Sequence, residues 1–359
     1  MTFVSKHHYA LELARQGHEV VFFGPPQPSH RLTLSAVHLQ ERIKGQLLLL
    51  QDDVVATGLR FMPPSLRRWL EARWLARLES RLGGPIDVIW NFENSRFYDM
   101  AFAGNRLRIY QQVDLNQAFH AAQAAATADL SIALSDPIAR VLQPYARQLL
   151  RLTHGHHGVS STSPLPCEWL QIFETTRRSH GAQLMLVGNL DIPYLDIPLL
   201  VQAVAQHPQA MFHLVGPYRA GIGLHGALQH APNVRFWGPQ PSQHLPLLMA
   251  QADLLLVTYQ QETHREQLAN PHKLMEYLAS GRAILATHTL EYAQRADLMT
   301  MSSTAAEFLE LLAAVLPELP ALNAPERVAH RQAYAREHTY SQQLQRIAQA
   351  LGPRAAMIA

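Results

Sequence analysis

The segment from Asn270 to Gly281 carries the residue types and spacing best suited to chemistry on a phosphorylated ligand. It reads Asn-Pro-His-Lys-Leu-Met-Glu-Tyr-Leu-Ala-Ser-Gly, with Lys273 three residues before Glu276. Pro271 suits the first turn of a helix, so both charges would lie on one face near the helix N-terminus. The positive helix end and the lysine could hold a diphosphate, while the carboxylate accepts hydrogen bonds from ribose hydroxyls. The alternative is a surface ion pair on an ordinary helix.

Two further motifs suggest chemistry that the surrounding sequence does not support. Gly221, Gly223 and Gly226 spell G-x-G-x-x-G, but no acidic residue follows before Asp253, so we reject a dinucleotide site there. His154, His156 and His157 are dense enough to suggest a metal. No cysteine or carboxylate lies near them in sequence, so we favour a chance cluster or a hinge and expect no metal.

A basic helix is predicted at 66–82. Its apolar residues recur at a spacing of four; they are Leu66, Leu70, Trp74, Leu78 and Leu82. Trp69 and three arginines flank them, and the arginines are Arg73, Arg77 and Arg81. We favour packing against a sheet with the arginines extending into solvent. Peripheral contact with an anionic membrane through 66–82 is the alternative.

Short apolar runs alternate with amphipathic stretches, which is the pattern of parallel sheets with crossover helices. The expected helices are Lys6–Gln16, Leu66–Leu82, Asp136–Ala146 and a final one around Ser341–Leu351. The expected strands are Glu19–Phe23, Ile86–Phe92, Leu107–Val113, Leu130–Leu134, Leu149–Thr153, Leu184–Val187, Met211–Val215, Val234–Trp237, Leu254–Thr258 and Ala283–Thr287. A linker is expected near 155–180, where Gly, Ser and Pro interrupt the pattern.

The helix before Glu19 implies an earlier strand, which would be the centre of the first sheet. Only Met1–Val4 is available for it. Either these residues form a short strand, or the natural start lies upstream of Met1, which is the interpretation we favour.

Composition bounds the function classes. The 359 residues suggest two domains at roughly 150 residues each. Lys and Arg total 30 against 28 for Asp and Glu, so nucleic acid is not an expected partner. The single cysteine, Cys167, excludes an internal disulfide and a cysteine-based zinc site. Because no apolar run approaches about 20 residues and no signal peptide is evident, we expect a cytoplasmic protein.

The segment around Lys273 resembles the donor-binding motif of GT-B-fold glycosyltransferases, especially family 4-like enzymes of glycosyl transferases group 1. Similar stretches occur in the expected order along nearly the whole chain; they are Gly17–Val20, Tyr110–Asp114, Ala128–Leu130, Leu186–Leu190, His213–Pro217 and Asn233–Gly238. The resemblance implies an α/β, GT-B-like fold of two Rossmann-like domains facing across a cleft. We expect 1–160 to be the acceptor-side domain, 161–335 the nucleotide-sugar domain, and 336–359 a helix crossing back to the first.

The resemblance also assigns roles to individual residues. Lys273 would contact the diphosphate and Glu276 the ribose hydroxyls of a nucleotide-sugar. The other donor-binding candidates are Gly188, Asn189, Gly216, Arg219 and Asn270. Gly188 and Asn189 would lie under the pyrophosphate, and Arg219 would be a second phosphate contact or a solvated loop charge.

The chain departs from the family pattern at Leu268, which stands where a second glutamate usually contacts the transferred sugar. An inverting reaction would need a general base, for which Asp114 is the candidate, with helix capping as its alternative role. We therefore expect a metal-independent glycosyltransferase acting on a glycan or a lipid-linked polysaccharide precursor. A sugar-nucleotide 2-epimerase of the same fold and an inert nucleotide-sugar-binding protein are the rivals.

Overall fold

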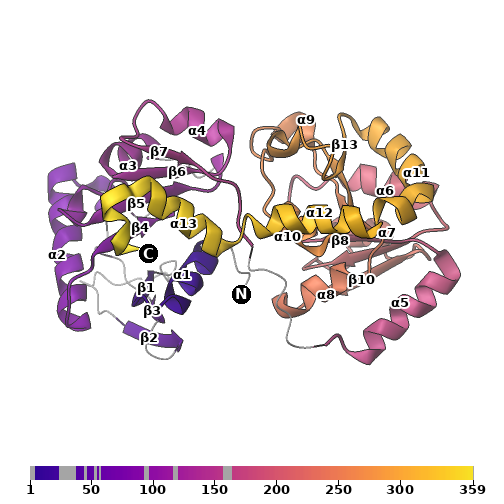
Figure 1. Ribbon diagram of the computed structural model, residues 1–359, viewed down its shortest axis with the longest axis horizontal. Helices are drawn as coiled ribbons and strands as arrows, with labels where there is room; N and C mark the ends of the chain where they lie inside the picture. Colours follow the sequence, from indigo (N-terminus) through magenta and orange to yellow (C-terminus); the bar gives the residue numbers. More distant parts are fainter. Residues whose placement is uncertain are drawn as a thin grey trace. The chain divides into compact units, whose positions relative to one another are not determined.

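A computed structural model describes residues 5–23, 38–43, 47–51, 55, 58–92, 97–115, 120–156 and 164–358. The chain divides into two compact units, one formed by Met1–Leu152 with Tyr340–Ala359 and the other by Thr153–Thr339 (Figure 1). Met1–Val4, where a short first strand is one of the two expectations, and His157 lie outside the described residues.

The described residues of the first unit form two sheets. A four-stranded parallel sheet has the order β4-β5-β6-β7, with strands β4 (Val88–Asn91), β5 (Leu107–Gln112), β6 (Leu130–Ala133) and β7 (Leu149–Arg151). A second sheet has the order β1-β3-β2, with β1 (Val20–Phe23), β2 (His38–Ile43) and β3 (Leu47–Gln51). β1 and β3 are parallel, whereas β2 and β3 are antiparallel.

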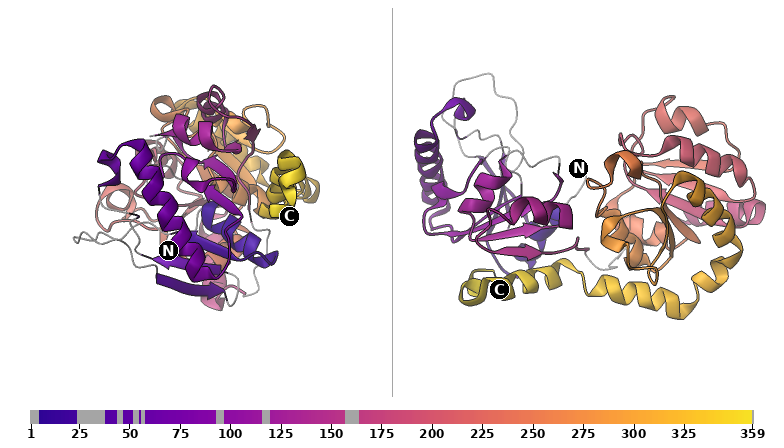
Figure 2. Two further views of the ribbon diagram at one scale, coloured as in Figure 1. Left: turned by 90° about the vertical axis from the view of Figure 1, so that its left-hand side faces the viewer. Right: turned by 90° about the horizontal axis from the view of Figure 1, so that it is seen from above.

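Helices cover these strands. They are α1 (Ser5–Arg15), α2 (Pro64–Leu82), α3 (Ala121–Thr127), α4 (Asp136–Leu142) and α13 (Tyr340–Leu351). α13 packs beside α1 and buries Tyr340, Leu344 and Ile347 in the same core as Tyr9 (Figure 1). α2 buries Trp74, Leu75 and Leu78 on the opposite side of the strands (Figure 2).

The second unit is built around one parallel sheet of the order β10-β9-β8-β11-β12-β13. Its strands are β8 (Gln183–Val187), β9 (Met211–Val215), β10 (Val234–Gly238), β11 (Leu254–Val257), β12 (Ala283–Thr287) and β13 (Thr300–Ser302). The helices are α5 (Cys167–His180), α6 (Ile197–Gln206), α7 (Gly223–Leu228), α8 (Leu245–Met249), α9 (Gln261–His264), α10 (Lys273–Ser280), α11 (Ala305–Leu322) and α12 (Pro325–Arg336). α12 runs beside α10 (Figures 1 and 2).

The parallel sheets confirm the α/β class. The linker expected near 155–180 is wrong over its second half, because α5 occupies Cys167–His180. Pro166 precedes this helix, Glu168 lies in its first turn and Arg177 and Arg178 in its last turn, which complements the helix dipole at both ends. Phe173 anchors the helix in the core. No helix in the described part of the chain combines the length and apolar character needed to cross a bilayer.

Candidate functional site

A glycine follows or ends each of the neighbouring strands β8, β9 and β10. Gly188 has φ +147° and Gly216 has φ +140°, conformations that side chains rarely adopt. A Cβ atom at Gly216 would lie 1.7 Å from the carbonyl oxygen of Gly188. The backbone amide of Gly216 donates to the carbonyl of Gly238 at 2.9 Å. The two loops therefore approach each other closely only because both positions lack a side chain.

Lys273 lies beside Gly188. Its Nζ would be 2.8 Å from a Cβ atom at Gly188, and it stands 4.9 Å from the centre of the Tyr259 ring. Lys273 is the first residue of α10, so its ammonium group and the positive end of the helix act on the same space. No carboxylate of the described residues forms an ion pair with Lys273 within 4.0 Å. This combination of bare backbone, helix N-terminus and cation suits a phosphate group.

The surroundings of Lys273 lower its affinity for a proton. Desolvation by burial lowers the pKa of Lys273 to about 8, and the nearby Glu276 partly opposes this change. The lysine is still mostly protonated at neutral pH, where its ammonium group is poorly solvated. An incoming anion would restore the interactions that the ammonium group lost on burial.

Tyr277 fixes α10 to the sheet. Its hydroxyl accepts a hydrogen bond from the backbone amide of Val187 at 2.8 Å and donates to the carbonyl of Leu256 at 3.2 Å. These contacts join the helix to the carboxyl ends of β8 and β11. Because Tyr277 is fully buried, the helix start is held in place relative to Gly188.

Glu276 lies in the first turn of α10, and its side chain is 37% exposed. His272 is its neighbour, with Nδ1 4.0 Å from the carboxylate. An exposed carboxylate in the first turn of α10, three residues after Lys273, can accept hydrogen bonds from a ligand. Lys273 and Glu276 form no ion pair with each other, so the surface ion-pair alternative does not describe their geometry.

The remaining predicted donor residues hold the adjoining loops. The side chain of Asn189 accepts a hydrogen bond from the amide of Asp191 at 3.0 Å, and Arg219 donates to the Asp191 carboxylate at 3.2 Å. Asn270 donates to the hydroxyl of Thr153 at 3.1 Å. The Arg219 side chain is 70% exposed and can leave this ion pair at little cost.

Two further positions singled out in the sequence are Asp114 and Leu268. Asp114 follows β5 in the first unit, where it is exposed. Leu268 is buried in the core of the second unit, so it offers no polar group to a sugar. Glu262 and Glu266 nearby are exposed.

The G-x-G-x-x-G stretch and the histidine cluster, which the sequence did not support as ligand sites, have structural roles. Gly223 begins α7, and a Cβ atom at Gly226 would lie 2.6 Å from the carbonyl oxygen of Gly221. The ring nitrogens Nε2 of His154 and His156 lie 3.0 and 2.7 Å from the carbonyl oxygens of Asn270 and Ala335. Across the described ranges, no group of three or more His, Cys, Asp or Glu residues is arranged to hold a metal ion.

A model for the family described as glycosyl transferases group 1 matches residues 181–317. No curated protein matches the chain. Among solved structures, HepE (Alr3699) of Anabaena in complex with UDP and glucose is 16% identical, with 86% of each chain covered and a TM-score of 0.63. WaaG, described as a glycosyltransferase involved in lipopolysaccharide biosynthesis, is 16% identical, with 97% of this chain and 95% of that chain covered and a TM-score of 0.61.

Sucrose-phosphate synthase (tll1590) from Thermosynechococcus elongatus is 14% identical, with 96% of this chain and 92% of that chain covered and a TM-score of 0.66. These likenesses extend over both units. The family model confirms the resemblance over residues 181–317, and the solved structures confirm the fold that the sequence predicts.

Proposed function

We propose that this chain, which has the GT-B fold and whose residues 181–317 match the model of glycosyl transferases group 1, is a glycosyltransferase. It would move a sugar from a nucleotide diphosphate to a hydroxyl group of a glycan or lipid-linked polysaccharide precursor. The observation that carries the donor half of this proposal is the position of the Lys273 ammonium beside Gly188, against whose backbone Gly216 packs. Support for a nucleotide-sugar donor also comes from HepE, whose structure contains UDP and glucose.

The proposed reaction places charge where the site can neutralise it. When the bond between the sugar and the diphosphate breaks, negative charge grows on the leaving oxygen. Lys273 and the amide groups at the start of α10 would stabilise that charge electrostatically. Glu276 would accept hydrogen bonds from the ribose hydroxyls and so orient the nucleotide. The glycine pair would let the diphosphate approach the backbone.

The other site residues have secondary roles in this proposal. Arg219 would exchange Asp191 for a phosphate oxygen, while Asn189 and Asn270 shape the loops on either side. We assign charge neutralisation to Lys273 rather than to a metal ion, which predicts turnover in the presence of a chelator. Asp114 is the proposed general base if the reaction inverts the sugar configuration.

A peripheral position at the cytoplasmic face of a membrane would suit a lipid-linked acceptor. WaaG is described as acting in lipopolysaccharide biosynthesis. On α2, the outward side carries Leu66 and Trp69, which are 45% and 53% exposed, with Arg73 stacked on the Trp69 ring. An apolar edge flanked by arginines suits an anionic lipid surface. The buried side of α2 still packs against strands, as the sequence favours.

A thermal-shift panel of UDP-, GDP-, dTDP- and ADP-sugars tests the donor assignment. A ligand at about 100 times its Kd adds about 2.7 kcal/mol of stability, or roughly 5–10 °C for a domain of this size. One nucleotide class should give this rise, and Lys273→Met and Glu276→Gln should remove most of it. Glu310→Gln on the exposed side of α11 is the matched control and should leave the rise intact. Failure of every nucleotide would refute the proposal.

Product analysis separates transfer from epimerisation. With the donor identified, release of nucleotide diphosphate that depends on an added acceptor supports transfer. A changed sugar that stays attached to its nucleotide in the absence of acceptor would instead identify a 2-epimerase.

A further inference from the structure

His154 is a buried histidine that the proposed sugar transfer does not use. Its side chain lies in the second unit and is 5% exposed. Its ring nitrogen Nε2 lies 3.0 Å from the carbonyl oxygen of Asn270. Because a carbonyl oxygen can only accept a hydrogen bond, Nε2 carries the proton and donates it. His154 is therefore held in one tautomer by the segment that leads into α10.

Asn270 is held at two points by consecutive residues. Its backbone carbonyl accepts the hydrogen bond from His154, and its side-chain amide donates to the hydroxyl of Thr153 at 3.1 Å. The preceding residue, Ala269, is buried, and its carbonyl accepts from the amide of Glu291 at 2.9 Å. Thr153 and His154 are the first two residues of the second unit. The chain thus fixes the approach to α10 at the point where it enters this unit.

The position of Asn270 is passed on to Lys273, because the chain between them is stiff. The ring of Pro271 restricts its φ to about −65°. The amide of Leu274 donates to the carbonyl of Pro271 at 3.1 Å, which closes the first turn around Lys273. Three residues at a helical rise of about 1.5 Å separate Asn270 from Lys273 by only about 5 Å. A displacement of Asn270 would therefore displace the start of α10.

His154 also contacts the neighbour of the second charged residue of the site. Its ring packs edge-on against the ring of His272, with centres 5.0 Å apart and planes at 76°. Nδ1 of His272 lies 4.0 Å from the carboxylate of Glu276. His154 thus touches the residues on both sides of Pro271, and these two residues lead to Lys273 and Glu276.

We propose that His154 is a positioning residue of the donor site, which together with Thr153 holds the start of α10 so that the Lys273 ammonium lies beside Gly188. This inference rests on the proposed function, because it assigns a role within that site. The clearance is small, since a Cβ atom at Gly188 would lie 2.8 Å from Nζ. A preorganised site holds its groups to within about 0.5 Å, and a misplacement of about 1 Å can cost about 100-fold in rate.

Four variants separate this role from simple packing. His154→Gln places an amide N–H near the position of Nε2 and can keep the hydrogen bond to Asn270. His154→Asn is too short to reach it, and His154→Ala removes the ring as well. His156→Ala is the matched control, because His156 is also buried and its Nε2 lies 2.7 Å from a backbone carbonyl, that of Ala335 on α12.

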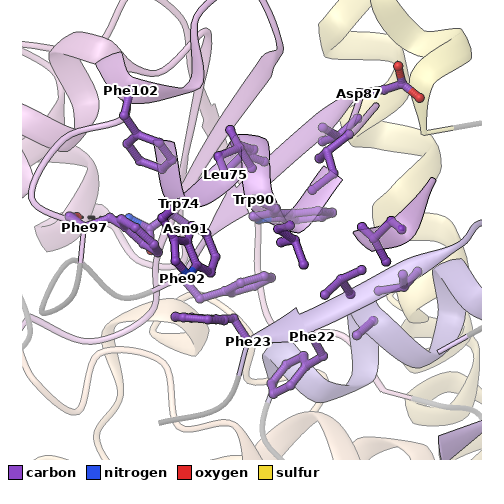
Figure 3. Close-up of a pocket in the computed structure, with 18 of the residues that line it drawn as sticks. Phe22, Phe23, Trp74, Leu75, Asp87, Trp90, Asn91, Phe92, Phe97 and Phe102 are labelled. Atoms are coloured by element: carbon purple, nitrogen blue, oxygen red, sulfur yellow. Dashed lines mark hydrogen bonds between the residues drawn. The ribbon is translucent and has the colours of Figure 1, made fainter. Parts of the chain in front are cut away.

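A fifth variant, Leu75→Ala, controls for a general loss of stability. Leu75 is buried and lines an apolar cavity of about 960 Å³ in the first unit (Figure 3). Removing this side chain should lower the Tm by about 5 °C or more. Lys273 lies in the other unit, so its surroundings should not change.

The first measurement needs no nucleotide. Acetylation of the Lys273 amine by acetic anhydride, followed against pH by mass spectrometry, reports where Nζ loses its proton. Burial lowers the pKa of Lys273 to about 8, and Glu276 partly opposes this change. In His154→Ala and His154→Asn the displaced ammonium group regains solvent, so its midpoint should rise by about one pH unit or more toward 10.5. In His154→Gln, His156→Ala and Leu75→Ala the midpoint should stay near 8.

The second measurement is the Kd of the nucleotide diphosphate at pH 7 by isothermal titration calorimetry. His154→Ala and His154→Asn should weaken binding by about tenfold or more, whereas the other three variants should stay within about threefold of the unaltered protein. The proposal is overturned if His154→Ala leaves the Lys273 midpoint unchanged, or if His156→Ala or Leu75→Ala shifts it as far. Failure of His154→Gln to restore the midpoint would overturn the assignment to the hydrogen bond. If no nucleotide binds the unaltered protein, the proposed function fails, while the Lys273 midpoint still decides the role of His154.

Discussion

Binding of a nucleotide diphosphate should weaken as pH rises through about 8, because Lys273 loses its proton there. In the proposed site the anion would bind to the protonated lysine, and burial lowers the pKa of that lysine from 10.5 to about 8. At pH 7 the ammonium form accounts for about 90% of the protein, and at pH 9 for about 10%. The apparent Kd divides by this fraction, so affinity should fall roughly tenfold over this range.

Two substitutions isolate the lysine in this experiment. Lys273→Arg keeps a positive charge at every pH tested, so its affinity should change far less between pH 7 and pH 9. Lys273→Met should lose about 1.5–3 kcal/mol of binding free energy at pH 7, which raises the Kd roughly 10–150-fold. Its affinity should fall little further at pH 9. Tyr259→Phe keeps the aromatic ring against Nζ and should behave as the unaltered protein.

Isothermal titration calorimetry with the nucleotide diphosphate provides the affinities. Ionisation of the ligand contributes equally to all proteins, so the comparison with Lys273→Arg removes it. A pH dependence that is the same in the unaltered protein and Lys273→Arg would refute the reasoning, as would a Kd that does not respond to Lys273→Met.

Three further predictions concern stability. Gly216→Ala should lower the free energy of unfolding by about 3 kcal/mol or more in chemical denaturation, because the added Cβ would meet the Gly188 carbonyl and φ is +140°. Gly221→Ala, at φ +75° with open space around the added Cβ, should cost about 1 kcal/mol, and equal losses would contradict the close approach. Tyr277→Phe should lower the free energy of unfolding by about 1–2 kcal/mol, because it leaves the buried backbone amide of Val187 without an acceptor. The loss is measured as a fall in Tm, and an unchanged Tm would show that Tyr277 does not anchor the helix. Burial raises the pKa of Glu71 from 4.5 to about 8, so the folded state keeps a proton that the unfolded state releases, and stability should fall between about pH 5 and pH 8. Glu71→Gln should flatten that decline in denaturation curves, and an unaltered decline would exclude Glu71 as its source.

Much of the fold could be predicted because its strands are short apolar runs with clear boundaries. The strand at Met211–Val215 agrees at both ends, since Pro208 and Gln209 lie shortly before it and Gly216 follows it. The antiparallel pair β2 and β3 was not predicted, because its pairing depends on contacts between segments rather than on local periodicity. α5 was missed because the Gly-, Ser- and Pro-rich stretch before it suggested that the linker continued.

The candidate site could be predicted only in part. Lys273 and Glu276 are evident from their spacing, and glycines at strand ends are visible in the sequence. The aromatic ring of Tyr259 beneath Nζ and the pairing of Arg219 with Asp191 were not predicted, because these contacts join loops that are distant in sequence. The lowered pKa of Lys273 could not be predicted either, because it depends on burial in the folded protein, which the spacing of residues in the sequence does not reveal.

Turnover of the Lys273→Met protein tests the central claim most directly. With the donor identified by the nucleotide panel, transfer of the sugar to an added acceptor is followed through the release of nucleotide diphosphate. The proteins compared are the unaltered protein, Lys273→Met and Glu310→Gln. If Lys273 stabilises the departing diphosphate, kcat/KM should fall by about 100-fold or more in Lys273→Met and stay unchanged in Glu310→Gln. A Lys273→Met protein that keeps the full kcat/KM would show that the donor reacts elsewhere.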